Sequence, residues 1–265
     1  MIHRKIITMA VAALSLASAA QAQNPPVTSC LDIFDLVTGT HTVIREFPFL
    51  IEAPNWSPDG KWLLVNKGGR LFRIAPDGQG DLIPVETGNI VQCNNDHVIT
   101  ADGRWIGLSS NDPEWKAGHN SFVYVVPFEG GQPRKITPVG PSYLHGISPD
   151  GKHIWFNSVR SGNMQVWRMN ADGTSQTQLT FDHDRNSWFP HVSPDGKSAV
   201  YIAYRADEVK PGDHPANKHV QLRLIPYDGG TPRVLLDFFG GQGSLNVNSW
   251  NPESTKFAFV SYRLQ

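Results

Sequence analysis

The sequence has few cysteines, no excess of charge and no apolar run long enough to cross a bilayer. Cys30 and Cys93 are the only cysteines, so a disulfide-stapled scaffold is excluded; the two either pair in an oxidising compartment or lie buried as small apolar side chains. The 23 basic residues nearly balance the 24 acidic ones. No Lys/Arg cluster suits a phosphate backbone, and nucleic acid is therefore not expected as a partner.

Familiar catalytic signatures are also missing. The chain has no G-x-S-x-G elbow for a serine hydrolase, and no H-x-H or H-E-x-x-H spacing for a metal. The glycine-rich stretch 240–243 precedes no predicted helix, so it does not predict a phosphate site. Any catalytic site would have to be assembled from residues that are distant in sequence.

The N-terminus has the pattern of an export signal. Arg4 and Lys5 precede an apolar run over 6–20, and the small-x-small triplet 20–22 follows it. The apolar run is shorter than the roughly 20 residues of a membrane span. We predict a signal peptide over 1–22 and one soluble domain over 23–265, periplasmic or secreted, without a membrane span and monomeric. No cysteine follows the cleavage site, so lipid attachment is not expected.

A turn motif recurs along the chain every 43 to 58 residues, close to the roughly 40 to 50 residues of a four-stranded propeller blade. In the motif Ser-Pro-Asp-Gly, Pro presets φ, Asp bonds the neighbouring backbone and Gly accepts a left-handed conformation. A β-branched and aromatic run follows each copy and predicts a strand. The copies, two of them decayed, begin at Ser57, Thr100, Ser148, Ser193 and Asn251.

A second turn signal, D-G or G-G, follows each of the first four copies after 18 to 34 residues, counted between the last glycines of the two signals, and predicts a second hairpin. Two hairpins make one blade, and four complete blades are predicted over roughly 53–86, 96–137, 144–180 and 189–236. A C-terminal inner hairpin (247–262) and an N-terminal outer hairpin (30–44) would complete a fifth blade and close the ring. The fold class is an all-β propeller with five blades; six stay possible if the polar stretch 205–218 is more than an inserted loop.

The segments 156–173, 178–180 and 193–197 resemble the repeat of the TolB-like propeller proteins. The resemblance implies a periplasmic protein that takes part in protein interactions of the cell envelope. The chain differs from TolB in having no room for a separate N-terminal α/β domain between Gln23 and the first strand. The same repeat recurs in the oligogalacturonate lyases, where the resemblance implies histidines near the inner strands that hold a divalent metal.

Function is expected just upstream of the turn motifs, where the innermost strands approach the axis of the ring. The residue before each motif is apolar and predicts packing between blades. Farther upstream the chain is polar, and the predicted ligand-binding residues are Glu52, Asn55, Asn95, Tyr143, Trp188, Asn246 and Asn248. Neutral imidazoles suit first-row metals, so a possible divalent metal site is predicted at His97, His145, His191 and Asp96, with His214 and His219 as weaker additions.

Two functions follow from these residues. The first is an exported scaffold that binds a protein, peptide or glycan partner in the cell envelope, favoured because no specific catalytic motif is present. The alternative is a metal-assisted carbohydrate lyase or hydrolase, in which a metal-bound water acts as base or nucleophile. The loop 182–185 (Asp-His-Asp-Arg) is expected to be a solvated connection between blades, with a functional role as the minor alternative.

Overall fold

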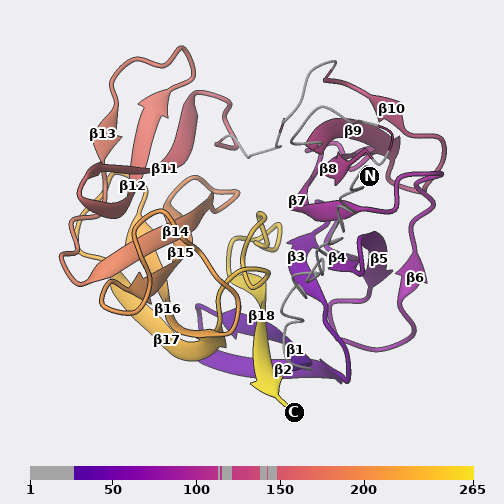
Figure 1. Ribbon diagram of the computed structural model, residues 1–265, viewed down its shortest axis with the longest axis horizontal. Helices are drawn as coiled ribbons and strands as arrows, with labels where there is room; N and C mark the ends of the chain where they lie inside the picture. The colour runs from indigo at the N-terminus through magenta and orange to yellow at the C-terminus, as the bar shows by residue number, and fades with distance from the viewer. Residues whose placement is uncertain (1–26, 113, 115–120, 138–141, 143–147) are drawn as a thin grey trace, which may run out of the picture.

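The computed structural model describes residues 27–112, 114, 121–137, 142 and 148–265. Within those residues all regular structure is β, in five antiparallel sheets around a common axis, which confirms the five-bladed propeller (Figure 1). No helix in this described part is long and apolar enough to span a membrane. The predicted signal peptide, Tyr143 and His145 lie outside the described residues.

Each blade is an antiparallel meander. The first consists of β3 (Glu52–Trp56), β4 (Leu63–Lys67), β5 (Arg70–Ile74) and β6 (Ile83–Pro84). The second consists of β7 (Cys93–Ile99), β8 (Trp105–Asn111), β9 (Ser121–Pro127) and β10 (Arg134–Lys135). The described strands of the third are β11 (His153–Ser161), β12 (Asn163–Asn170) and β13 (Thr177–Gln178). The fourth consists of β14 (Arg185–Val192), β15 (Ser198–Arg205), β16 (Lys218–Pro226) and β17 (Arg233–Gly240).

The fifth blade combines the two ends of the chain, as predicted. Its sheet has the order β18 (Lys256–Leu264), β1 (Val27–Asp35) and β2 (Thr40–Phe47), and a bridge from Trp250 to Phe257 marks its innermost segment. The β1–β18 pairing runs without interruption from Val27–Leu264 to Asp35–Lys256. Because the last blade is shared in this way, the two ends of the chain close the ring within one sheet.

The turn motifs close the first hairpin of the blades through one shared hydrogen-bond pattern. In the copy at Ser193, the hydroxyl donates to Asp195 Oδ1 at 2.6 Å, and that oxygen accepts from Lys197 N at 3.1 Å. The decayed copy at Asn251 keeps the geometry, because Asn251 Oδ1 accepts from Lys256 N at 2.8 Å and Ser254 takes the positive φ of the missing glycine. The aspartates of the motif are therefore turn residues, as the sequence predicts.

The core lies between the blades, because both faces of each inner sheet are covered. Leu63 packs toward the fifth blade and its neighbour Leu64 toward the second, and both are fully buried. This explains why second strands such as β4 and β15 are buried in continuous runs rather than in alternation. Cys30 on β1 and Cys93 on β7 are buried free thiols in different blades, so they do not pair.

Candidate functional site

The two ends of the ring differ. All five turn motifs lie at one end, here called the turn end, and the innermost strands begin at the opposite, far end. Five of the seven predicted ligand-binding residues stand five positions before the first residue of their turn motif in the sequence, namely Glu52, Asn95, Tyr143, Trp188 and Asn246. Tyr143 lies outside the described residues, and the other four occupy equivalent positions at the far end.

Two of these positions are joined directly. Asn95 Nδ2 donates to Glu52 Oε1 at 2.9 Å, which ties the inner strand of the second blade to that of the first. Asn246 Oδ1 accepts from Gly243 N at 2.7 Å in the fifth blade. Gly243 lies so close to Glu52 Oε1 and Tyr262 Oη that a Cβ at this position would collide with both. We call Glu52, Asn95, Gly243, Asn246 and Tyr262 the axial cluster.

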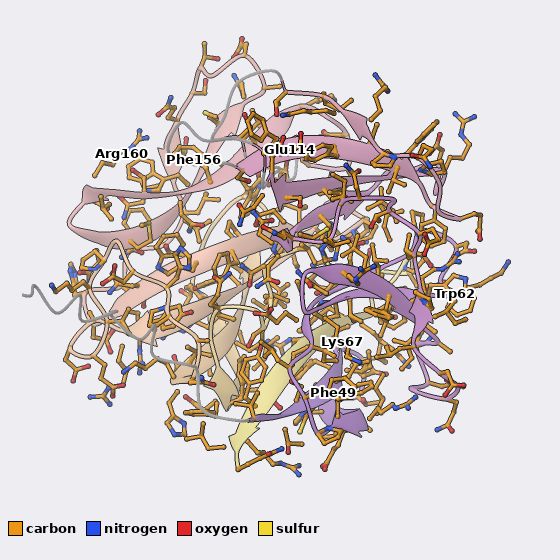
Figure 2. All side chains as sticks on the ribbon, turned by 45° about the vertical axis from the view of Figure 1, so that its right-hand side comes forward. Phe49, Trp62, Lys67, Glu114, Phe156 and Arg160 are labelled. Carbon is orange, nitrogen blue, oxygen red and sulfur yellow. The ribbon has the colours of Figure 1, made fainter. Side chains whose placement is uncertain are left out.

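The axial cluster holds a carboxyl group without a cation. Burial raises the pKa of Glu52, and the hydrogen bond from Asn95 opposes the rise only in part. Lys67, at the end of the adjacent strand β4, makes a cation–π contact instead, with its Nζ 4.0 Å from the ring centroid of Phe49 (Figure 2). In the described part of the chain Glu52 forms no ion pair.

The cluster also contains an unsatisfied hydroxyl. Tyr262, on β18, is 3% exposed, and its Oη has no hydrogen-bond partner within the residues described. Burial raises the pKa of this phenol, and the charge of Glu52 raises it further. Buried polar atoms are nearly always paired, so an unpaired phenol beside a carboxyl without a cation sets this cluster apart from the rest of the described core.

Backbone irregularities position these groups. Ala53 and Phe189 each stand four residues before their motif, and their φ values are 54° and 58°. Non-glycine residues rarely adopt this region, and such residues concentrate at functional sites. The register of β3 against β4 shifts there, and Ala53 N turns to donate to Gly243 O at 2.6 Å. The irregular backbone thereby attaches the first blade to the fifth at the axial cluster.

Two predicted ligand-binding residues serve to join blades. Asn55 Nδ2 donates to His97 O at 3.4 Å, and Asn248 Nδ2 donates to Val192 O at 3.2 Å. Trp188 is partly exposed and its ring packs against His214, with centroids 4.5 Å apart. Trp188 is therefore the one of these three that offers a surface at the far end.

The described histidines of the predicted metal site occupy different registers. His97 stands three residues before its motif and His191 two. His97 is fully buried without a regular hydrogen bond at either nitrogen, and burial lowers its pKa to about 4. His191 Nε2 lies 3.0 Å from Leu245 O, and Asp96 N donates to Asn94 Oδ1 at 2.9 Å. Among the residues described, no group of three or more His, Cys, Asp or Glu side chains could hold a metal ion.

The stretch after Arg205 is an inserted loop, as predicted, and covers part of the far end. Residues 206–217 connect β15 to β16. Tyr204 Oη donates to Pro215 O at 3.0 Å, and His214 Nδ1 lies 2.8 Å from Gln242 Oε1. The loop thus links the fourth blade to the segment that carries Gly243. His219 lies apart from it on β16, with its ring against Phe239.

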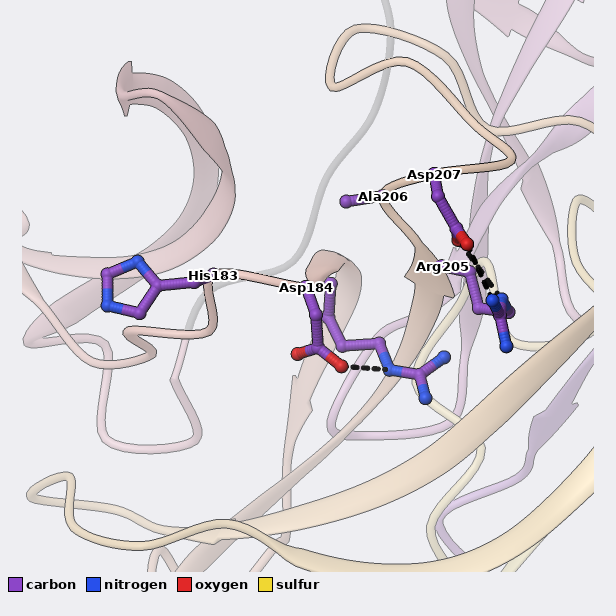
Figure 3. Close-up of a pocket in the computed structure, with 6 residues that line it drawn as sticks. His183, Asp184, Arg205, Ala206 and Asp207 are labelled. Carbon is purple, nitrogen blue, oxygen red and sulfur yellow. Dashed lines mark hydrogen bonds and ion pairs between the residues drawn. The ribbon is translucent and has the colours of Figure 1, made fainter.

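A pocket of about 320 Å³ opens beside this loop at the start of β14 and the end of β15 (Figure 3). Its lining is almost entirely charged and consists of His183, Asp184, Arg185, Arg205, Ala206 and Asp207. Sequence reasoning named the segment 182–185 as a charged loop but did not find its partners on β15. Tyr262 and Gly243 were also missed, because a strand tyrosine and a loop glycine carry no local signal of such a role.

No family model matches the chain. The Agrobacterium fabrum protein named Uncharacterized protein Atu1656 is 37% identical over 278 aligned positions, which cover 88% of this chain and 92% of the relative. A solved structure from Agrobacterium tumefaciens, provisionally assigned as TolB, is 37% identical with a TM-score of 0.82, covering 89% of this chain and 99% of that one. TolB from Acinetobacter baumannii is 15% identical with a TM-score of 0.42, over 90% of this chain and 64% of its own, which is too distant to inform function.

A closed five-bladed ring with a polar cluster at one end defines a propeller scaffold, a class suited to binding. The identity and coverage of the two Agrobacterium proteins give the family: the chain belongs to the TolB-like β-propellers.

Proposed function

We propose that this protein is an exported, non-catalytic propeller that binds a protein, peptide or glycan partner of the cell envelope across its far end. The observation that carries the proposal is the axial cluster, where Glu52 has no counter-charge and Tyr262 Oη has no partner within the described residues. Glu52 and Asn246 are partly exposed, so an incoming group can reach them. The export signal supports the location, and the absence of a catalytic motif favours binding over turnover.

The two polar groups of the axial cluster that lack a full set of partners, the Glu52 carboxylate and the Tyr262 phenol, differ in their hydrogen-bonding chemistry. The Glu52 carboxylate accepts hydrogen bonds and attracts cations, while the phenol of Tyr262 both donates and accepts. A partner that supplies hydroxyl, amide or ammonium groups would bond the partly exposed Glu52 carboxylate, whose one hydrogen bond within the described residues comes from Asn95. The Tyr262 phenol lies buried beside this carboxylate.

The proposal is tested by capture from an envelope extract on the immobilised chain 23–265. We expect the double variant Glu52→Gln, Tyr262→Phe to lose at least tenfold of the specifically captured species, measured by quantitative mass spectrometry. The matched control is Lys61→Ala, because Lys61 is 75% exposed at the turn end. Equal capture by the double variant and the wild type would refute the far end as the binding surface.

The metal site stays a prediction. His97 offers a neutral imidazole without regular hydrogen bonds, and a metal-assisted carbohydrate lyase or hydrolase would need His145 and His191 beside it. Metal analysis of the protein purified without chelators, together with the variants His145→Ala and His191→Ala, decides the question. Stoichiometric metal that is lost in both variants, with turnover of a polysaccharide, would favour this function over the scaffold.

A further inference from the structure

We infer that the pocket beside the inserted loop is a binding site for a carboxylate group, with Arg185 as its anchor. This site uses none of the axial-cluster residues and goes beyond the function proposed for them. The inference depends on the cavity itself, on the unmet hydrogen-bonding capacity of Arg185 and on the charges around it.

Arg185 is the first residue of β14, and its side chain is 17% exposed. Its only charged contact within the described residues is an ion pair with Asp184, in which Nε and Oδ2 are 3.5 Å apart. That contact lacks hydrogen-bond geometry, so the buried Nε is unsatisfied. A guanidinium has five N–H donors, and none of those of Arg185 makes a hydrogen bond within the part of the chain that the structure describes.

Two neighbouring arginines, the similarly buried Arg223 and the more exposed Arg205, are well bonded. Arg223, 11% exposed, donates to Asp182 Oδ2 at 2.9 Å and to Gln221 Oε1 at 2.9 and 2.6 Å. Arg205 pairs with Asp207 through two nitrogens, at 3.0 and 2.5 Å, and with Glu208 at 3.0 Å. Arg185 is directly opposite Arg205 in the strand register. Of the two guanidiniums that line the pocket, that of Arg205 is therefore held by two carboxylates, whereas that of Arg185 makes no hydrogen bond within the described residues.

The charges around the pocket balance, so the attraction for an anion comes from the free donors of Arg185, and a singly charged anion disturbs the balance least. Hydrogen bonds from Arg205 lower the pKa of Asp207, and the charge of Arg185 adds to this effect. A carboxylate matches the planar fork of a guanidinium with two parallel hydrogen bonds. A phosphate dianion would bring a second negative charge toward Asp184 and Asp207, and a cation would face Arg185 directly.

The size and lining limit the ligand to a small polar group. A volume of about 320 Å³ lies at the lower end of the range of ligand sites, roughly 300 to 1,000 Å³. Ala206 is the only apolar residue of the lining. The pocket therefore suits the acidic end group of a ligand rather than an apolar body.

The test uses matched probes that differ only in the carboxylate. Glucuronate is compared with glucose, and a tripeptide with a free C-terminus is compared with its amide; inorganic phosphate is a fifth probe. Binding is followed by calorimetry and ligand-observed NMR. We expect binding of the acid of at least one pair, with its neutral counterpart and phosphate at least tenfold weaker; the pair that responds identifies the source of the carboxylate.

Two variants keep the inference falsifiable. Arg185→Gln should weaken binding of the acid at least tenfold, while Arg263→Gln, which alters an exposed arginine paired with Glu46, should leave it unchanged. Asp184→Asn should strengthen binding severalfold, because it removes the competing carboxylate, and this gain would not arise from misfolding. The inference is overturned if neither acid binds, if phosphate binds more tightly, or if affinity is unaffected by both pocket variants.

Discussion

The turn end and the far end of the ring are built from the same strands but differ in how fully their polar groups are paired. At the turn end each Ser or Thr hydroxyl bonds both its Asp and the backbone, as Thr100 Oγ1 does with Asp102 Oδ1 at 2.6 Å and with Trp105 N at 3.1 Å. At the far end Tyr262 Oη is unpaired and Glu52 lacks a cation in the described residues. A repeated turn that satisfies its own polar groups stabilises the scaffold, whereas the far end keeps a buried unpaired phenol beside a partly exposed carboxyl.

The largest expected difference between the ends comes from the same substitution at two glycines. Gly243→Ala should lower the free energy of unfolding by about 3 kcal/mol or more, because its φ is 89° and the new Cβ would collide with Tyr262 Oη and Glu52 Oε1. Gly60→Ala at the turn end should cost only about 1 kcal/mol, since φ is 76° and the nearest atom is Pro252 Cγ at 3.7 Å. Urea denaturation measures both, and equal costs would remove the contrast.

The second prediction concerns the acid stability that depends on His97. Its pKa is lowered from 6.5 to about 4 in the folded protein, so the unfolded chain binds the proton more tightly. Stability therefore falls as the pH drops from about 6.5 to 4, by about 3 kcal/mol in total.

His97→Leu should abolish that part of the pH dependence, measured by urea denaturation at several pH values. The control is His183→Leu, because His183 is exposed. An unchanged slope in His97→Leu would show that the imidazole is not held neutral by burial.

Removal of one hydroxyl at each end gives a smaller contrast. Ser193→Ala should cost about 1 kcal/mol, because Ser193 Oγ donates to Asp195 at 2.6 Å and accepts from Ser198 N at 3.2 Å. Tyr262→Phe should be neutral or stabilising, since no partner loses a bond. A cost for Tyr262→Phe as large as that for Ser193→Ala would mean that the phenol is satisfied in solution.

The smallest expected effect is the titration of Glu52. Its raised pKa means that the folded protein binds the proton more tightly than the unfolded chain, so stability falls as the pH rises above the ordinary glutamate value of 4.5. Glu52→Gln should remove this loss and be more stable than the wild type at neutral pH. Thermal unfolding at pH 4.5 and 7.5 checks the sign, and a lower stability of the variant at pH 7.5 would contradict it.

The sequence predicted the blades because their determinants are local. The turn motifs act through residues within five positions of each other, and even Asn251 and Ser254 could be recognised by their spacing. The shared fifth blade followed from counting hairpins. The different register of His97 and His191 was also readable from their distances to the motif.

The functional groups at the far end were harder to predict because their state depends on distant neighbours. Tyr262 sits in a strand that reads as core, and its unpaired hydroxyl follows from the position of Gly243 and Glu52 in other segments. Arg185 lacks hydrogen bonds within the described residues, while Arg205, opposite it, pairs with the nearby carboxylates of Asp207 and Glu208. Neither the absence of a bond nor a competition between partners leaves a pattern in the sequence.

The shared blade also makes the completion of folding depend on the whole length of the chain. β1 is synthesised first and its partner β18 last, yet they pair from Val27–Leu264 to Asp35–Lys256. Until Lys256 and the residues after it are available, β1 and β2 have only each other, and an isolated two-stranded hairpin is marginally stable in water. A chain interrupted before β18 would remain an open ring with exposed strand edges, which are substrates for proteases and templates for aggregation. The closing strand pair thus distinguishes molecules with a closed ring from those with an open one.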